Sequence, residues 1–152
     1  MPSRTAGTPS RQIPRFIAVE GPIGAGKTTL ARRLAASFGH ELVLELADEN
    51  PFLENFYRER ARNALATQLF FLIQRVRQLD AIRQADLFQN SRVTDFLIEK
   101  DRLFARLNLD ANELALYETV FERLVPSTPR PDLVIYLQAP VDVLIERIQR
   151  RG

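Results

Sequence analysis

The first residues that can do chemistry lie in a glycine-rich turn near the N-terminus, IAVEGPIGAGKTT at residues 17–29. Gly21, Gly26, Lys27 and Thr28 satisfy G-x-x-x-x-G-K-[ST], with a short apolar run before the pattern and helix-forming residues after it. Small residues let the backbone wrap around a phosphate, whose negative charge is attracted to N–H groups at a helix N-terminus. The residues predicted to hold the phosphates of a nucleoside triphosphate are Gly21, Pro22, Ile23, Gly24, Ala25, Gly26, Lys27, Thr28 and Thr29.

ATP and Mg²⁺ are the predicted cofactors. In this pattern the lysine, Lys27, reaches the β- and γ-phosphates, and the hydroxyl of Thr28 can bind the metal. Asp95 follows a strand-like run and can complete the metal shell, although an ordinary turn aspartate fits the same pattern. The turn alone does not say what happens to the γ-phosphate.

Other side chains are candidates for the acceptor side. Glu45 lies near the end of a predicted strand, where a carboxylate can orient an acceptor hydroxyl and take its proton. Gln68 and Arg75 share one side of a long helix, at the border of its apolar stripe, where they can read a base edge. Solvated surface residues would give the same patterns, so both interpretations stay open.

Strand and helix patterns alternate along the chain. A parallel sheet covered by helices on both faces follows from this alternation. The predicted strands are residues 16–20, 41–46, 92–98 and 132–138, and the predicted helices are residues 27–38, 63–86, 111–125 and 141–151. The last helix carries Arg147, Arg150 and Arg151, which can face a γ-phosphate or form a solvated basic helix end.

Composition narrows the class of protein. The 152 residues suit one domain, and we expect residues 1–13 to be a flexible tail before a domain spanning 14–152. A net charge of +2 is too small to indicate a nucleic-acid partner. No apolar run approaches the roughly 20 residues of a membrane helix, and no signal-peptide core is present. The absence of cysteine is compatible with a cytoplasmic protein.

Taken together these residues resemble the deoxynucleoside kinase family, and the resemblance runs from about Phe16 to Gly152. GPIGAGKTTL is similar to the family's phosphate loop, and ENPFLENFY is similar to its bacterial branch. Tyr57 and Gln68 match the spacing of a sugar-binding Tyr and a base-reading Gln. The remaining similar stretches are QRVR at 74–77, DRLFA at 101–105 and VIYLQAP at 134–140.

The resemblance implies a P-loop NTPase-like three-layer fold, and it assigns roles to the matching positions. Glu45 would be the base for the deoxyribose 5′-hydroxyl. Tyr57 would contact the sugar and Gln68 the base. Arg147 and Arg151 would be lid arginines over the transferred phosphate. Three further residues would stack on the base or shape base preference: Phe104, Arg75 and Asp101. A homodimer is what the family implies.

The sequence departs from the family pattern in two places. Many members carry an Arg after the acid of the third strand, whereas Phe96 follows Asp95 here. Lys100 or Arg102 would have to substitute for that Arg. The chain also ends just after its basic helix, so we expect the family's final strand to be missing.

The leading hypothesis is a deoxynucleoside kinase that transfers the ATP γ-phosphate to a 5′-hydroxyl in nucleotide salvage. One alternative is a truncated nucleotide-binding module without turnover, and another is a nucleoside monophosphate kinase. A third alternative, a nucleotide-gated switch, is less favoured because no guanine-specificity motif follows the fourth predicted strand. Purine and pyrimidine bases both stay possible.

Overall fold

The computed structural model describes residues 12–85 and 90–151, so most of the expected N-terminal tail lies outside the described residues. Within these two ranges, two short 3₁₀ helices accompany the main elements. The elements in chain order are β1 (Phe16–Glu20), α1 (Lys27–Phe38), β2 (Glu41–Val43), η1 (Ala47–Glu49), α2 (Leu53–Arg58), α3 (Arg60–Ala85), β3 (Arg92–Thr94), α4 (Ile98–Asn108), α5 (Ala111–Leu124), η3 (Val125–Ser127), β4 (Leu133–Tyr136) and α6 (Val141–Arg151).

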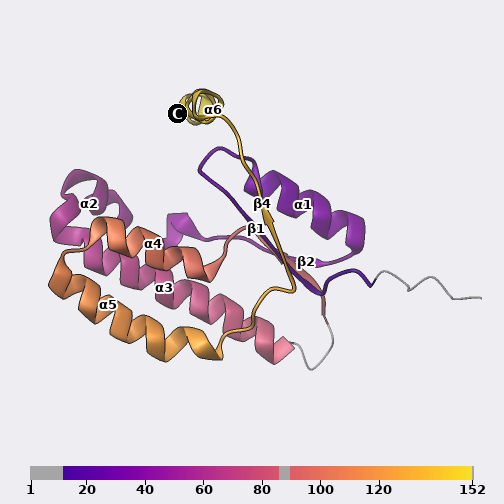
Figure 1. Ribbon diagram of the computed structural model, residues 1–152, viewed down its shortest axis with the longest axis horizontal. Coiled ribbons are helices and arrows are strands. Elements are labelled where there is room, and N and C mark those ends of the chain that lie inside the picture. The colour runs from indigo at the N-terminus through magenta and orange to yellow at the C-terminus, as the bar shows by residue number, and fades with distance from the viewer. Residues whose placement is uncertain (1–11, 86–89, 152) are drawn as a thin grey trace, which may run out of the picture.

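The four strands form one parallel sheet in the order β2-β3-β1-β4. Helix α1 lies on one side of this sheet, and the layer of α3, α4 and α5 lies on the other (Figure 1). The predicted three-layer α/β architecture is confirmed. Because all four strands run the same way, their carboxyl ends meet at one edge, where parallel sheets of this kind bind ligands.

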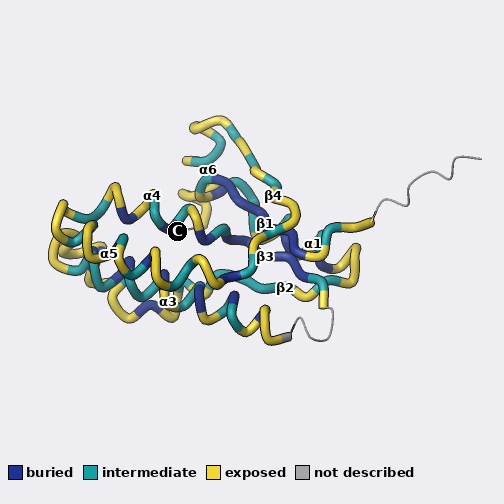
Figure 2. Tube along the Cα trace, turned by 60° about the horizontal axis from the view of Figure 1, so that its bottom comes forward, coloured by how far each residue is buried: buried dark blue, intermediate teal, exposed yellow. Residues whose placement is uncertain are grey.

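The hydrophobic core consists of two clusters, one on each face of the sheet. On the α1 side, Ile17, Val19 and Val93 pack against Ala31 and Ala35. On the other side, the apolar stripe predicted for the long helix packs with Phe16 and with side chains of α4 and α5. Figure 2 shows the consequence, since β1 and β3 are the most buried part of the trace. The central strands therefore form a rigid base for the loops that follow them.

Three predicted strands are shorter in the structure, and the sequence prediction was wrong about their ends; β4, for example, spans Leu133–Tyr136 instead of 132–138. Residues 44–46 leave β2 because the Leu44 carbonyl accepts from the Gln78 side chain and the Glu45 N–H donates to Asp95. Residues 95–98 leave β3, and Ile98 begins α4 instead. Phe96 and Ile98 are buried, and a short apolar run of this kind fits a buried strand and a buried helix start equally well.

The helix predictions hold more closely. Helix α1 ends where expected, because Gly39 adopts the left-handed conformation that closes it. Helix α5 begins with a reciprocal capping box between Asp110 and Glu113. Helices α2 and α4 were not predicted. Among the described residues, no helix combines the length and apolar character needed to cross a bilayer.

The α3 stripe yields a stability prediction. Leu72 is 0 % exposed in the core under the sheet, whereas Leu107 on α4 is 80 % exposed. Leu72→Ala should lower the free energy of unfolding by about 2–5 kcal/mol, because it removes buried methyl groups and leaves a cavity. Urea denaturation measures this, and Leu107→Ala is the matched control with a change within about 0.5 kcal/mol. Equal effects of the two substitutions would contradict the packing described here.

Candidate nucleotide and acceptor site

The glycine-rich turn joins the carboxyl end of β1 to the N-terminus of α1, as the pattern predicted. Gly21 lies against β4, where a Cβ would meet the Leu137 carbonyl oxygen at 2.6 Å, so any side chain there would push the turn away from the sheet. Gly26 precedes the helix with φ 93°, a conformation that favours glycine. The first turn of α1 carries no acidic residue, so its partial positive charge stays available to an anion.

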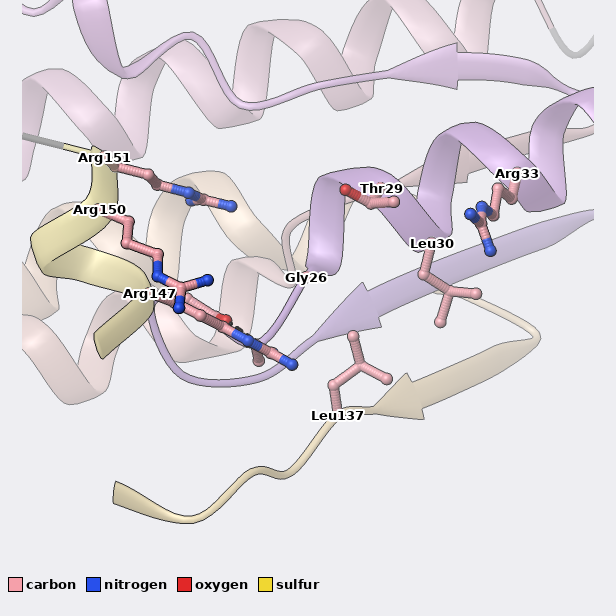
Figure 3. A pocket seen from close by; sticks show the side chains of 10 residues that line it. Gly26, Thr29, Leu30, Arg33, Leu137, Arg147, Arg150 and Arg151 are labelled. Carbon is pink, nitrogen blue, oxygen red and sulfur yellow. Dashed lines mark hydrogen bonds between the residues drawn. The ribbon is translucent and has the colours of Figure 1, made fainter. Parts of the chain in front are cut away.

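A cavity of 560 Å³ opens on the α1 side of this turn. Helix α6 projects arginine side chains across it toward the start of α1, where Thr29 lies (Figure 3). One of them, Arg147, donates a hydrogen bond of 3.1 Å to the Gly24 carbonyl. The lining residues are Gly24, Ala25, Gly26, Thr29, Leu30, Arg33, Leu137, Arg147, Arg150 and Arg151. The cationic lining suits a polyphosphate.

A second cavity, of 580 Å³, lies on the other side of the turn, between the strand ends and helices α2, α3 and α4. All six residues predicted to bind the acceptor line it: Glu45, Tyr57, Gln68, Arg75, Asp101 and Phe104. These six side chains come from the loop after β2 and from three helices, α2, α3 and α4. Gln68 is buried, whereas Tyr57 and Phe104 are exposed at the cavity's edge. The cavity has an apolar wall, to which Phe56 and Phe71 contribute.

Asp95 joins the phosphate loop to the segment that carries Glu45. One of its carboxylate oxygens accepts from the Thr28 hydroxyl at 2.7 Å, and the other accepts from the Glu45 backbone N–H at 2.7 Å. Arg75 then forms ion pairs with both Glu45 and Asp101. The phosphate loop and the predicted base are therefore parts of one hydrogen-bonded frame.

The frame continues into the helical layer. Asp101 is 1 % exposed and accepts from the hydroxyl of Tyr117 on α5. Burial raises the pKa of Tyr117 above its ordinary value, which keeps this hydroxyl protonated as a donor. Arg75 also lies over the Phe71 ring, 5.1 Å from its centre. The guanidinium is thereby oriented from three directions.

Several residues of the site were not predicted from the sequence. Arg33 lines the first cavity, and Glu20 and Tyr117 hold other site residues in place. Arg102, considered as a substitute for the absent Arg, points elsewhere because it pairs with Glu118. The hydrogen bond from this guanidinium to Glu118 raises the pKa of Arg102. A usable signal existed for Glu20, which directly precedes the glycine-rich turn.

The oxygen donors present fit magnesium. Thr28 and Asp95 already meet, and both are hard oxygen ligands of the kind this ion prefers. Over the described ranges, no group of three or more His, Asp or Glu side chains gathers as a protein cage for a metal. Magnesium commonly takes only one or two protein ligands and completes its shell with phosphate oxygens and water.

The fold and the loop define a P-loop NTPase-type protein with a second cavity beside its phosphate site. Comparison with known proteins narrows this class. The profile of the deoxynucleoside kinase family matches residues 17–152. The deoxyguanosine kinase of Bacillus subtilis is 37 % identical over 90 % of this chain and 67 % of its own length. The deoxyadenosine/deoxycytidine kinase of that organism is 34 % identical over 90 % and 65 %.

Structural comparison agrees. The deoxyadenosine kinase of M. mycoides with bound dATP superimposes with a TM-score of 0.75 at 29 % identity, covering 90 % of this chain and 72 % of that one. The chain belongs to the deoxynucleoside kinase family, which comprises phosphotransferases with a hydroxyl acceptor. It spans about two thirds of the length of the curated relatives it matches.

The ion-pair frame yields a second stability prediction. Arg75→Met should destabilise the protein by about 3–5 kcal/mol, because it leaves the buried charge of Asp101 without its cation. Adding Asp101→Asn removes that charge and should restore part of the loss. Thermal unfolding of the two variants beside the parent measures both effects. A double variant less stable than Arg75→Met by the full cost of Asp101→Asn alone would show that the two residues are not coupled.

Proposed function

We propose that this protein is a deoxynucleoside kinase that transfers the γ-phosphate of ATP to the 5′-hydroxyl of a deoxynucleoside. The observation that carries the proposal is the joint placement of a phosphate loop and an acceptor cavity through Asp95. Family membership supports the reaction class, and the relative with bound dATP supports a nucleoside triphosphate in the loop.

One set of residues binds the triphosphate and another set binds the acceptor. Lys27, the helix N-terminus and the α6 arginines bind the triphosphate and offset its charge. On the acceptor side, Gln68 and Arg75 face the base, Phe104 stacks on it, and Tyr57 contacts the sugar. Glu45 accepts the proton of the 5′-hydroxyl while the hydroxyl oxygen bonds to the γ-phosphorus; the bond from that phosphorus to the bridging oxygen breaks, and ADP leaves. Arg75 keeps the Glu45 carboxylate oriented for that task.

ATP would supply the phosphoryl group, and Thr28 and Asp95 would hold Mg²⁺, which would supply positive charge at the terminal phosphates. Since phosphoryl transfer passes through a loose transition state, a strong base is not needed. Catalysis by this chain would rest on positioning and on preorganised charge. The rigid Asp95 frame serves the first of these, and the cationic lining of the phosphate cavity serves the second.

Assembly and location are part of the same proposal. We propose a homodimer in the cytoplasm, supported by the resemblance to the family, and a single kinase domain over residues 14–152. Sedimentation velocity of the purified chain at several concentrations tests the dimer. A monomer at every concentration would overturn that part alone.

The experiment that tests the reaction is Mg-ATP-dependent phosphorylation of the four deoxynucleosides by the chain and by Glu45→Gln. We expect one or more monophosphates from the chain. Removal of the proton acceptor should lower kcat by about 10²- to 10⁴-fold. ATP binding should persist in the variant, because Glu45 lines the acceptor cavity and not the α1-side cavity. The preferred deoxynucleoside would also identify the base.

The other outcomes separate the alternatives. Intact ATP binding without any monophosphate would replace the kinase proposal with a nucleotide-binding module. Phosphorylation of nucleoside monophosphates in preference to deoxynucleosides would favour a monophosphate kinase. Full activity of Glu45→Gln would remove Glu45 from the reaction while leaving the kinase proposal in place.

A further inference from the structure

The two lysines of this chain, Lys27 and Lys100, meet at one point. They are its only lysines, because 19 of its 21 basic residues are arginine. Seventy-three positions separate them in the sequence, and yet both ammonium groups donate to the carbonyl oxygen of Gly21, each at 2.8 Å. A chain that otherwise uses arginine thus carries its compact point charges at the phosphate loop alone.

A buried carboxylate holds the pair. Glu20 is buried at the end of β1, and its oxygen Oε1 lies 2.6 Å from the Lys100 ammonium and 3.7 Å from that of Lys27. Its other oxygen accepts from the Leu97 backbone N–H at 3.2 Å. Lys100 is therefore fastened by the short ion pair, whereas Lys27 is held mainly by the carbonyl.

The cluster carries a formal excess of one positive charge, with two ammonium groups and one carboxylate. Both lysines remain reachable, because their side chains are 20 % and 23 % exposed. An anion entering the loop would complete this charge balance. Lys27 can turn to it by giving up one hydrogen bond and a long ion pair.

The position of Lys100 shows from which side it would meet that anion. Lys100 lines the acceptor cavity together with Lys27 and Glu45, and it does not line the α1-side cavity. Its ammonium also lies 5.6 Å from the centre of the Phe104 ring at the edge of the acceptor cavity. A group passing from the phosphate loop to the Glu45 side would pass this ammonium.

We propose that Lys100 is a second phosphate-binding lysine, which contacts the transferred phosphoryl group from the acceptor side while Lys27 contacts it from the loop. It contributes positive charge, with Glu20 as its positioning residue. The proposal rests on the proposed kinase function and names the cation that replaces the Arg absent after Asp95. Arg102 is unsuited to that task, since it pairs with Glu118 on α5.

Lysine labelling tests the contact without turnover. With two lysines in the chain, trace acetylation read by peptide mass spectrometry follows each ammonium separately. Magnesium with the non-hydrolysable analogue adenylyl imidodiphosphate should slow acetylation of both lysines several-fold. Protection of Lys27 alone would overturn the role of Lys100 and leave nucleotide binding intact. Protection of neither would overturn the proposed nucleotide site and, with it, this inference.

Kinetics test the role in transfer. Lys100→Met should lower kcat by about 10²- to 10³-fold, the effect of removing one donor aimed at developing charge, with a much smaller change in the KM for ATP. Lys100→Arg keeps the charge and should recover part of kcat. Arg102→Met, two positions away on the same helix, is the matched control and should keep kcat within a few-fold.

A second variant separates this role from a merely structural one. Lys100→Met leaves Glu20 with a buried charge. The double variant, in which Glu20→Gln is added to Lys100→Met and which is called the pair below, removes that charge. If Lys100 only neutralised Glu20, the pair would regain the kcat of Glu20→Gln. We expect the pair to stay at the low kcat of Lys100→Met while thermal unfolding shows recovered stability. Regained kcat in the pair would overturn the proposal.

Discussion

The carboxylate of Asp95 is the contact on which the arrangement of the site depends. Its two oxygens hold the Thr28 hydroxyl in the phosphate loop and the Glu45 backbone N–H after β2. Asp95 is itself buried at the end of β3, between the strands that precede the phosphate loop and Glu45. A shift of either partner would strain a part-buried hydrogen bond of 2.7 Å, so the phosphate loop and the Glu45 segment are kept at one spacing.

Ion pairs surround that contact on both sides. Arg75 connects Glu45 to the buried Asp101, and Tyr117 supplies a further donor from α5. Beside the phosphate loop, the buried Glu20 forms an ion pair with Lys100. Glu20 and Asp101 are thus each paired with a cation that also lines the acceptor cavity, and this pairing offsets the cost of burying their charges.

Much of the fold could be predicted because its signals are local. The glycine pattern, the 3.6-residue apolar stripe of α3 and the alternation of strands with helices depend on neighbouring residues. Strand ends were predicted less well. Leu44 and Ile98 were predicted as strand residues because they are apolar, but neither lies in a strand. Leu44 accepts a hydrogen bond from Gln78, which is distant in sequence, and Ile98 begins α4. The candidate acceptor residues were found through the family resemblance, since Gln68 and Arg75 alone matched a surface pattern equally well.

The sequence by itself determined the phosphate loop, the α/β class and the two-sided burial of the sheet, because short-range spacing sets backbone conformation and hydrophobic period. Only the tertiary structure decided which acids and cations meet. Thr28 and Asp95 are 67 positions apart, and Lys100 and Glu20 are 80 positions apart. Such pairs form because parallel strands bring their carboxyl ends to one edge, and the order β2-β3-β1-β4 selects which ends are neighbours.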